Sequence, residues 1–244
     1  MRTCIIGDVH GCVDEFRQLY ELFDPKPGDR VIQVGDLMDR GPDPVGCVRF
    51  AISMGIEVTA SNHDDKHARW RKHRANNPGK KNPVNLKEKD IEDNLQLSDQ
   101  EIQWMASAPL MIRALSNVVV VHAGLEPAYS LSQQGTHVKI VRYVDSKGKF
   151  VGYRGGNIFE QPEGTRAWSE VWNGPESVVY GHHIHSFETP RMDRFDGGFC
   201  LGIDTGCVYG GRLTAAVFED GCQEPEFLQV SPSKVHYEAF PVKP

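Results

Sequence analysis

Short apolar runs alternate with amphipathic stretches over the first 60 residues of the chain. The runs at Thr3–Ile6, Arg30–Val34 and Ile56–Thr59 predict strands, because each is short, largely apolar and followed by turn-forming or polar residues. Apolar side chains at helical spacing predict helices over Val13–Phe23 and Pro44–Met54. This βαβαβ order predicts a parallel sheet covered by helices, and such a sheet binds ligands outside the carboxyl ends of its strands.

The rest of the chain predicts further strands with a different spacing. Two apolar runs on either side of Ser116–Asn117 predict a strand pair over Leu110–Leu115 and Val118–Val121. Ser98 with Glu101 three residues later is a capping box and predicts the start of a helix. Residues 126–176 hold several Gly and Pro and predict loops over the site. Four later runs predict a second, mostly antiparallel sheet: Val178–Tyr180, Phe199–Ile203, Leu213–Phe218 and Glu226–Val230.

Five polar clusters follow predicted strands, and they carry the chemistry of this chain. They are GDVHG at 7–11, GDLMDRG at 35–41, SNHDD at 61–65, HAG at 122–124 and GHHIH at 181–185. Their carboxylate, amide and imidazole donors suit Mn, Fe or Zn, and the absence of thiolates argues against a structural zinc site. Two such metals about 3.5–4 Å apart can clamp the attacking and leaving oxygens of a phosphoryl displacement.

Composition and charge narrow the class of protein. The hydrophobic share of 39% and charged share of 25% are those of a globular protein, and the net charge of −6 argues against general affinity for nucleic acid. The first residues lack a secretory signal pattern, and no apolar stretch reaches the ~18 residues of a membrane span. The six cysteines lack CxxC spacing and indicate reduced thiols, so we expect a cytoplasmic protein. Cys12 and Cys207 flank site loops, and burial alone accounts for them at this stage.

A basic segment follows the third cluster directly. Residues 66–89 contain six Lys and three Arg against one Glu, a local charge of +8. Lys66–Arg74 has helical character, whereas the turn-rich stretch at 76–83 cannot continue a helix. One interpretation is a solvated helix and loop. The other is a lid that attracts a polyanion, with Trp70 available to stack on a base, which leaves nucleic-acid binding possible although a stable complex is not expected.

The order of the five clusters resembles that of the calcineurin-like metallophosphoesterases. More narrowly, it is similar to their phosphoprotein-phosphatase branch, which includes bacterial and phage serine/threonine phosphatases and symmetrical diadenosine tetraphosphatases. GIDTGCVYGGRLTAAVFEDG at 202–221 is similar to the closing segment of that branch, so the resemblance spans about residues 1–221. It implies an α/β (α+β) fold in which helices flank a two-sheet β-sandwich. It also implies a single domain over 1–244, with the basic segment as an insertion at about 66–97 that forms a lid.

The resemblance implies two groups of metal ligands that share one carboxylate. The first group is Asp8, His10 and Asp36, and the second is Asp36, Asn62, His122 and His182. The cofactors implied are two divalent ions, with Mn²⁺ as first choice and Fe or Zn as alternatives. In GHHIH the alignment favours His182 as the ligand, with His183 or His185 as competitors.

The family pattern also implies catalytic roles. His63 is the expected general acid, Asp39 its partner, and Arg40 the expected catalytic contact to the phosphate. Arg166 is a second candidate for binding the substrate phosphate. Separately, Asp204 is a candidate acceptor for a ligand histidine. The family usually has Gly before the Asn-His pair; here it is Ser61, which needs a negative φ or tolerated strain.

Three functions are compatible with these residues. The first is a metal-dependent phosphatase acting on phosphomonoesters by direct attack of a hydroxide that bridges the metals, with phosphoserine or phosphothreonine in proteins as the substrate. The second is a hydrolase of dinucleoside polyphosphates such as diadenosine tetraphosphate, or a nucleic-acid end phosphatase. The third is a catalytically silent protein that binds metal or nucleotide. The expected partner is thus a phosphorylated protein or a nucleotide, without a membrane, and the sequence does not identify the oligomeric state.

Overall fold

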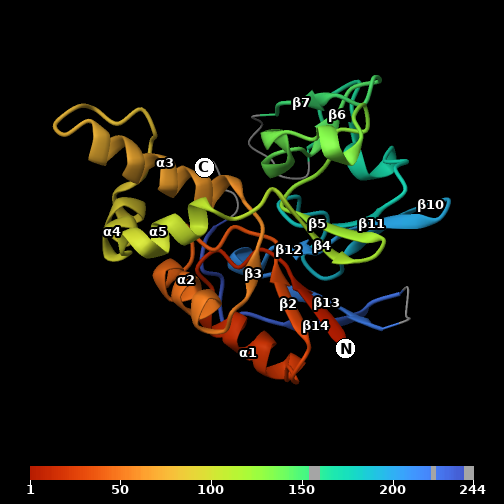
Figure 1. Cartoon of the computed structure of the whole chain (residues 1–244), viewed down its shortest axis with the longest axis horizontal. Coiled ribbons are helices and arrows are strands. Elements are labelled where there is room, and N and C mark those ends of the chain that lie inside the picture. Colours follow the sequence, from red (N-terminus) through yellow and green to blue (C-terminus); the bar gives the residue numbers. More distant parts are fainter. Residues whose placement is uncertain (154–159, 221–223, 239–244) are drawn as a thin grey trace.

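Two β-sheets packed face to face form the centre of the fold (Figure 1). This computed structural model describes residues 1–153, 160–220 and 224–238. In the first sheet the strand order is β12-β13-β1-β2-β3, and β14 pairs with β13. Its strands are β1 (Arg2–Ile6), β2 (Arg30–Gln33), β3 (Glu57–Val58), β12 (Asp204–Thr205), β13 (Arg212–Glu219) and β14 (Glu226–Val230). The strands β1, β2 and β3 run parallel, as the βαβαβ pattern predicts.

The second sheet has strand order β10-β11-β9-β5-β4 and is mixed. Its strands are β4 (Met111–Leu115), β5 (Val118–Val121), β9 (Ser177–Tyr180), β10 (Arg191–Phe195) and β11 (Gly198–Gly202). The predicted antiparallel pair β4 and β5 is confirmed, but β9 pairs in parallel with both β5 and β11. The prediction of a mostly antiparallel second sheet is therefore wrong. The strands β13 and β14 lie instead in the first sheet, where β13 pairs antiparallel with β1.

Alternation along the strands divides the apolar side chains between the layers. On β1, Ile5 packs between the two sheets, whereas Cys4 and Ile6 belong to the core on the opposite face of the first sheet. On β5, Val120 packs between the sheets and Val119 packs on the outer face of the second sheet. This period of two is the expected signature of strands buried on both faces. The two-sheet sandwich is confirmed.

Helices cover the outer face of the first sheet. The helices α1 (Val13–Phe23) and α2 (Pro44–Ser53) match their predicted ranges within one residue and pack Phe16, Leu19 and Val48 against that face. The side chain of Asp43 caps α2 by accepting a hydrogen bond from Gly46 N at 2.7 Å, and Pro44 occupies the first turn, where its missing N–H costs nothing.

Three further helices extend beside this layer at the left of the view, in orange to yellow (Figure 1). They are α3 (Asn62–Asn76), α4 (Glu88–Gln96) and α5 (Asp99–Ala106). The Ser98 capping box that predicts α5 is confirmed. The helix α4 was not predicted, because its buried residues, Asp90, Asp93 and Asn94, are polar and do not form an apolar stripe. Among the described residues, no helix is long and apolar enough to cross a membrane.

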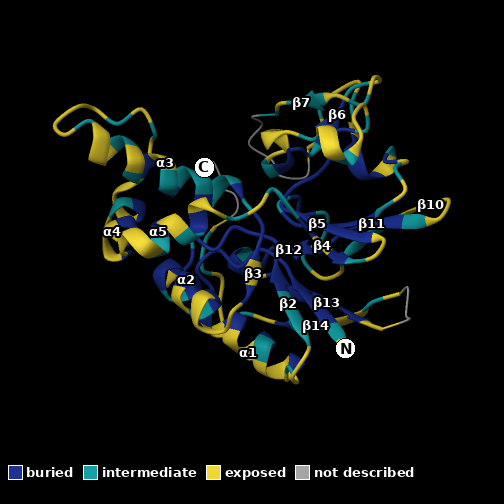
Figure 2. Cartoon of the chain, in the orientation of Figure 1, coloured by how far each residue is buried: buried dark blue, intermediate teal, exposed yellow. Residues whose placement is uncertain are grey.

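Four of the nine Lys and Arg side chains of the basic segment are paired with acids outside it. Lys66 lies 2.6 Å from Asp39, Arg69 bonds Asp65, Arg71 lies 2.9 Å from Asp99, and Lys89 bonds Asp93. The far end of α3 and the loop after it are largely exposed (Figure 2). The indole of Trp70 is 6% exposed, and the Arg74 guanidinium lies 5.3 Å from its ring centroid. The prediction that Trp70 is available to a base is therefore wrong.

A small three-stranded sheet lies over the outer face of the second sheet, at the upper right of the view (Figure 1). It pairs β7 (Phe150–Val151), β6 (Tyr143–Val144) and β8 (Arg166–Ala167). Short 3-10 turns complete the described part of the chain: η1 (Leu131–Gln133), η2 (Thr136–Lys139), η3 (Trp168–Glu170) and η4 (Cys207–Tyr209). Residues 126–176 were predicted as loops, so this sheet corrects the sequence reading for part of that range.

Candidate active site

The five polar clusters meet at one edge of the sandwich. They follow β1, β2 and β3 of the first sheet and β5 and β9 of the second. Gly181 N donates to His122 O at 2.7 Å within the second sheet, and the Nδ1 atom of His122 lies 2.8 Å from Val34 O, which ties the second sheet to the first. Parallel strands bring their carboxyl ends to one edge, so side chains distant in sequence converge.

Asp36 lies at the centre of the cluster, and its two carboxylate oxygens face different histidines. Oδ2 is 3.3 Å from Nε2 of His10 and 4.0 Å from Nε2 of His63, whereas Oδ1 is 3.4 Å from Nε2 of His122. Two sets of donor atoms, each set within 4.8 Å of one another, share this residue: His10, Asp36 and His63, and Asp36, His122 and His182. A carboxylate with one oxygen toward each set is suited to bridge two cations.

Backbone carbonyls orient two of the imidazoles. His10 Nδ1 lies 3.0 Å from Met38 O, and His122 Nδ1 lies 2.8 Å from Val34 O. With Nδ1 donating to a carbonyl oxygen in this way, each ring turns the lone pair of Nε2 toward Asp36, where it can bind a metal ion. Burial and the nearby Arg40 guanidinium lower the pKa of His10, so its ring is neutral, the form that binds a metal.

Asp8, Asn62 and His182 complete the predicted set. Both Asp8 oxygens accept from His182 N at 3.1 Å, and Asn62 Oδ1 lies 3.0 Å from His122 Nε2. Burial, reinforced by Asp204 and Asp36, raises the pKa of Asp8. A divalent cation would offset this concentration of buried negative charge. The structure thus brings all six predicted ligands together.

The competition within GHHIH is resolved by position. His182 belongs to the donor set with Asp36, and its ring lies 5.0 Å from that of His122. His183 and His185 instead contact Tyr143 and Tyr180, at 3.3 and 3.2 Å from the phenol oxygens. The geometry therefore favours His182 over its two neighbours.

Unusual backbone conformations concentrate in this site. Of the six non-glycine residues with positive φ in the described ranges, five are predicted site residues: His10, Asp36, Asp39, Arg40 and His182. Such conformations are sparsely populated for L-residues and persist where the surrounding structure imposes them, often at functional sites. Packing is equally tight at Gly181, where a Cβ would lie 2.0 Å from Asp8 Oδ1. Any larger residue there would displace the Asp8 carboxylate.

His63 and Asp39 form a hydrogen-bonded pair at the edge of the donor cluster. Asp39 Oδ2 bonds Nδ1 of His63 and also accepts from Lys66 Nζ at 2.6 Å, while Oδ1 lies 2.7 Å from Nε2 of His67. Although burial alone would raise it, hydrogen bonds from His63 and His67 hold the pKa of Asp39 well below its ordinary value. Asp39 is therefore an anion that fixes a proton on Nδ1 of His63 and directs Nε2 toward Asp36.

Two arginines approach the cluster, and only one of them was predicted. Arg40 donates to His63 Nε2 at 3.0 Å and also bonds Nε2 of His10. The second is Arg142, which precedes β6, is half-buried, and donates to His182 O at 3.1 Å. The Nε atom of Arg142 is buried without a hydrogen-bond partner among the described residues, so it has a donor left for a ligand.

The predicted phosphate contact Arg166 lies elsewhere. Its guanidinium is 61% exposed and bonds Glu170, and it lines a different surface cavity together with Asp145 and Lys147. Arg142 is the arginine that the sequence reading missed. It stands alone among the apolar residues Val141, Tyr143 and Val144, and this isolated charge in an apolar run is the only signal the sequence offered.

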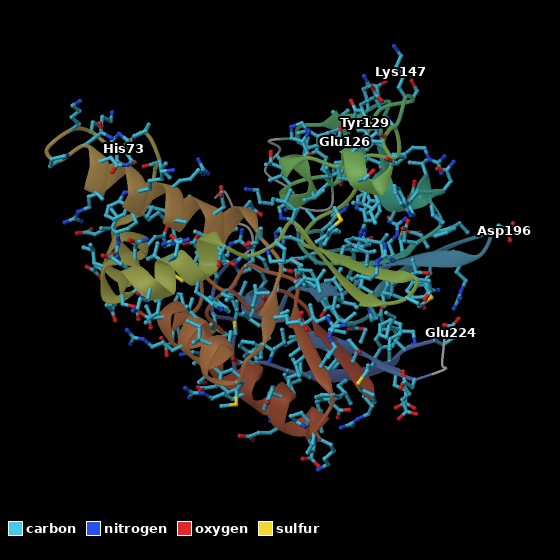
Figure 3. The ribbon with its side chains drawn as sticks, in the orientation of Figure 1. His73, Glu126, Tyr129, Lys147, Asp196 and Glu224 are labelled. Atoms are coloured by element: carbon cyan, nitrogen blue, oxygen red, sulfur yellow. The ribbon has the colours of Figure 1, made fainter. Side chains whose placement is uncertain are left out.

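A cavity of about 380 Å³ opens beside His182. It is lined by Ile140, Arg142, Phe150, Val151, Gly152, Tyr153 and His182. Glu126 supports this wall, because its carboxylate accepts from Phe150 N at 3.0 Å and lies 3.0 Å from Nδ1 of His137 (Glu126 is labelled in Figure 3). The cavity therefore combines one arginine, two aromatic rings and one predicted metal ligand.

Ser61 occupies its position without strain. Its φ of −123° lies in the extended region, and its side chain caps α3 by accepting from Asp64 N at 3.3 Å. Asp64 then accepts from Met38 N at 3.0 Å and Leu37 N at 3.3 Å. This buried carboxylate, to which the sequence reading gave no role, fixes the Asp36–Arg40 loop against α3. Asp204, predicted as an acceptor for a histidine, accepts from Gly206 N at 3.0 Å instead.

Comparison with known proteins identifies the class to which this geometry belongs. The calcineurin-like phosphoesterase family profile matches residues 1–186. The chain belongs to this family, which confirms the resemblance drawn from the five clusters. It is a phosphoric ester hydrolase of a family that uses divalent metal ions, and the two donor sets sharing Asp36 fit a pair of such ions.

Named relatives narrow the comparison further. The chain is 33% identical to the asymmetrical bis(5'-nucleosyl)-tetraphosphatase PrpE of Bacillus velezensis, covering 88% of each protein, and 30% identical to that of Bacillus subtilis, covering 98% of each. It is 26% identical to the symmetrical bis(5'-nucleosyl)-tetraphosphatase of Glaesserella parasuis, over 90% of this chain and 96% of the relative.

Solved structures agree with these relatives. A crystal structure provisionally assigned as a diadenosine tetraphosphatase superposes with a TM-score of 0.73 at 29% identity, covering 94% of this chain and 93% of that one. A protein serine/threonine phosphatase from Saccharomyces cerevisiae gives a TM-score of 0.57 at 13% identity, covering 96% of this chain and 81% of that one. The second comparison shows a shared fold only.

Proposed function

We propose that this protein hydrolyses dinucleoside tetraphosphates. The comparisons support this second sequence hypothesis better than the first, a serine/threonine phosphatase, because the named relatives are bis(5'-nucleosyl)-tetraphosphatases. The observation in the structure that carries the proposal is the cavity beside His182, which offers aromatic rings and an arginine next to the donor cluster. The hypothesis of a catalytically silent binding protein is not supported.

The proposed cofactors are two divalent ions, with Mn²⁺ as first choice. Asp8, His10 and Asp36 would hold one ion, and Asp36, Asn62, His122 and His182 the other. When bound, a pair of dications supplies a nucleophilic water at neutral pH and neutralises charge on the phosphate. Three residues that offer oxygen and three that offer imidazole nitrogen, in the absence of sulfur, suit Mn, Fe or Zn.

The chain's own residues bind the phosphate and deliver a proton. Arg40, which reaches both His10 and His63, is placed to contact the phosphoryl oxygens, and Arg142 is placed to contact them from the His182 side. Fixed guanidinium donors stabilise the charge that develops on these oxygens. His63, held by Asp39 at Nδ1, is the proposed donor of a proton to the leaving phosphate group.

The cavity is the proposed site for one nucleoside of the substrate. Bases stack on aromatic side chains, and here Phe150 and Tyr153 line the same cavity as Arg142. Lys66 and Arg71 of the basic segment form ion pairs with Asp39 and Asp99. We therefore do not propose that these two side chains bind a polyanion. We propose that residues 66–97 form one wall of the site within a single domain, and that the protein does not form a stable complex with nucleic acid.

Replacing Tyr153 with alanine should raise KM for diadenosine tetraphosphate by about 5- to 150-fold, because a base stacked on an aromatic ring is worth ~1–3 kcal/mol. Tyr153→Phe keeps the ring and should leave KM close to that of the wild type. Steady-state kinetics on diadenosine tetraphosphate and on O-phosphoserine measure the effect, and only the first substrate should respond. Equal losses on both substrates would show that Tyr153 supports the structure and does not hold a base.

A further inference from the structure

Outside the candidate active site, one buried group of side chains has the composition of a metal site. The Cys12 thiol, the Glu15 carboxylate and the His236 ring have ligand atoms within 4.8 Å of one another. The Nε2 atom of His236 lies 3.1 Å from Glu15 Oε1. Cys12 precedes α1 and Glu15 lies in its first turn, so their spacing of three residues places them on one face of the helix.

The group is enclosed by protein. Cys12 is 0% exposed and Glu15 6%, and the side chain of His236 is 7% exposed. A buried carboxylate is unfavourable unless a cation or several hydrogen bonds compensate it. The structure gives the Glu15 carboxylate the His236 ring as its partner, with Nε2 3.1 Å from Oε1. None of these three side chains has a role in the phosphoesterase mechanism.

A fourth donor lies against this group. The thiol of Cys207, in η4, is 1% exposed and hydrogen-bonds the Cys12 thiol. His236 lies beside these thiols because the C-terminal segment is hydrogen-bonded to η4. The backbone N–H groups of His236 and Tyr237 both donate to Val208 O, at 3.1 and 2.9 Å. Three separate parts of the chain therefore converge on one point.

We propose that Cys12, Glu15, Cys207 and His236 bind one zinc ion, separate from the two ions of the active site. Zinc takes four ligands in a tetrahedron and prefers thiolate, imidazole and carboxylate donors, which are the three types present here. With Zn–S of about 2.3 Å and Zn–N of about 2.0–2.1 Å, neighbouring donors would lie ~3.3–3.8 Å apart. The donor atoms of Cys12, Glu15 and His236, now within 4.8 Å of one another, would close by up to about 1 Å, and the Cys207 thiol would move in as the fourth ligand. Binding releases the thiol protons to solvent.

The position of the group gives this zinc ion a structural consequence. Cys12 lies two residues after His10, and its Sγ is 3.9 Å from His10 O. The ion would cross-link the C-terminal segment and η4 to the loop that carries His10. The ion would stabilise the structure next to the active site and take no part in phosphoryl transfer.

Cobalt(II) is the probe that distinguishes this site from the active site, because only sulfur ligands give an intense near-ultraviolet sulfur-to-cobalt charge-transfer band. The predicted active-site ligands contain no sulfur. We expect the full-length protein, reduced and freed of metal, to develop this band at one cobalt per chain, and zinc to abolish it by displacement. Cys12→Ala should remove the band, and His236→Gln should weaken cobalt binding more than tenfold. Cys200→Ala, at a fully buried thiol in the second sheet, is the matched control and should retain the band.

Two outcomes would overturn the proposal: no charge-transfer band in the wild type, or a band that persists in both Cys12→Ala and Cys207→Ala. Circular dichroism establishes that each variant is folded. If Cys12→Ala does not fold, His236→Gln decides, because its side chain comes from the segment that follows the last strand, β14. Phosphatase turnover is recorded separately, so failure of this site and failure of the proposed function give different results.

Discussion

His63→Asn is expected to lower kcat by about 10²- to 10⁴-fold while the protein keeps its two divalent ions, because general acid catalysis contributes an effect of that size. The expectation rests on two contacts. Asp39 bonds His63 Nδ1, and His63 Nε2 lies 4.0 Å from Asp36 Oδ2, at the edge of the donor cluster. Asparagine fills part of the same space but cannot protonate a leaving group. Single-turnover kinetics and metal analysis of the purified variant measure the two quantities.

The matched control lies on the same helix. His73→Asn changes a histidine near the outer end of α3 (Figure 3) and should leave kcat unchanged. Loss of a metal ion in His63→Asn would contradict the acid role, since His63 also lies within reach of His10 and Asp36 as a candidate ligand. Full activity in that variant would contradict it as well.

Asp36→Asn should lose at least one of the two ions and lower kcat/KM by more than about 10³-fold. Metal ions supply several kcal/mol of transition-state stabilisation, and each 1.36 kcal/mol corresponds to a factor of ten. The substitution should leave the backbone conformation unchanged, because Asp36 has a φ of 59° and asparagine tolerates this conformation better than most residues. The amide retains one carbonyl oxygen but cannot bridge two cations with two negatively charged oxygens. Metal analysis and steady-state kinetics test both parts.

Asp24→Asn is the control for backbone effects. Asp24 ends α1 with a φ of 47° and is exposed, so it carries the same strain and the same chemical change far from the donor cluster. Its activity and metal content should equal those of the wild type. If Asp36→Asn kept both ions, the bridging role assigned to Asp36 would be wrong.

Much of the site followed from the sequence because its residues lie where short patterns have a strong meaning. Asp8, Asp36 and Asn62 follow parallel strands, and parallel strands place their ends at one edge, so their meeting point was predictable. Alignment favours His182 over His183 and His185, and the structure supplies a physical reason: of the three, only His182 lies in a donor set with Asp36 and His122.

Other features were not predictable because they depend on long-range contacts. Arg142 comes from a range without clear periodicity, and only the tertiary fold brings it to His182. The helix α4 was missed because it buries Asp90, Asp93 and Asn94, which satisfy Lys66, Lys89 and His67 instead of packing as an apolar face. Trp70 was predicted to be available for stacking on a base, but it is buried, and the few apolar residues around it in the sequence did not indicate this.

The second sheet shows the same limit. Short apolar runs identified the strands β9, β11, β13 and β14 nearly to the residue, yet pairing is decided by contacts between distant segments. The long strand β13 pairs with β1 in the first sheet, whereas β9 pairs in parallel with β5 in the second. The hydrophobic pattern of a single strand does not determine which other strand it pairs with.

The central claim is that the substrate is a dinucleoside tetraphosphate, and a direct comparison of kcat/KM tests it. Diadenosine tetraphosphate and a phosphoserine peptide are assayed with the same Mn²⁺-loaded protein, and the nucleotide products are separated to identify the bond that is cleaved. We expect kcat/KM for diadenosine tetraphosphate to exceed that for the peptide by at least about 100-fold, as expected from ~3 kcal/mol of base stacking and phosphate contacts. Equal values, or a preference for the phosphopeptide, would contradict the proposed function.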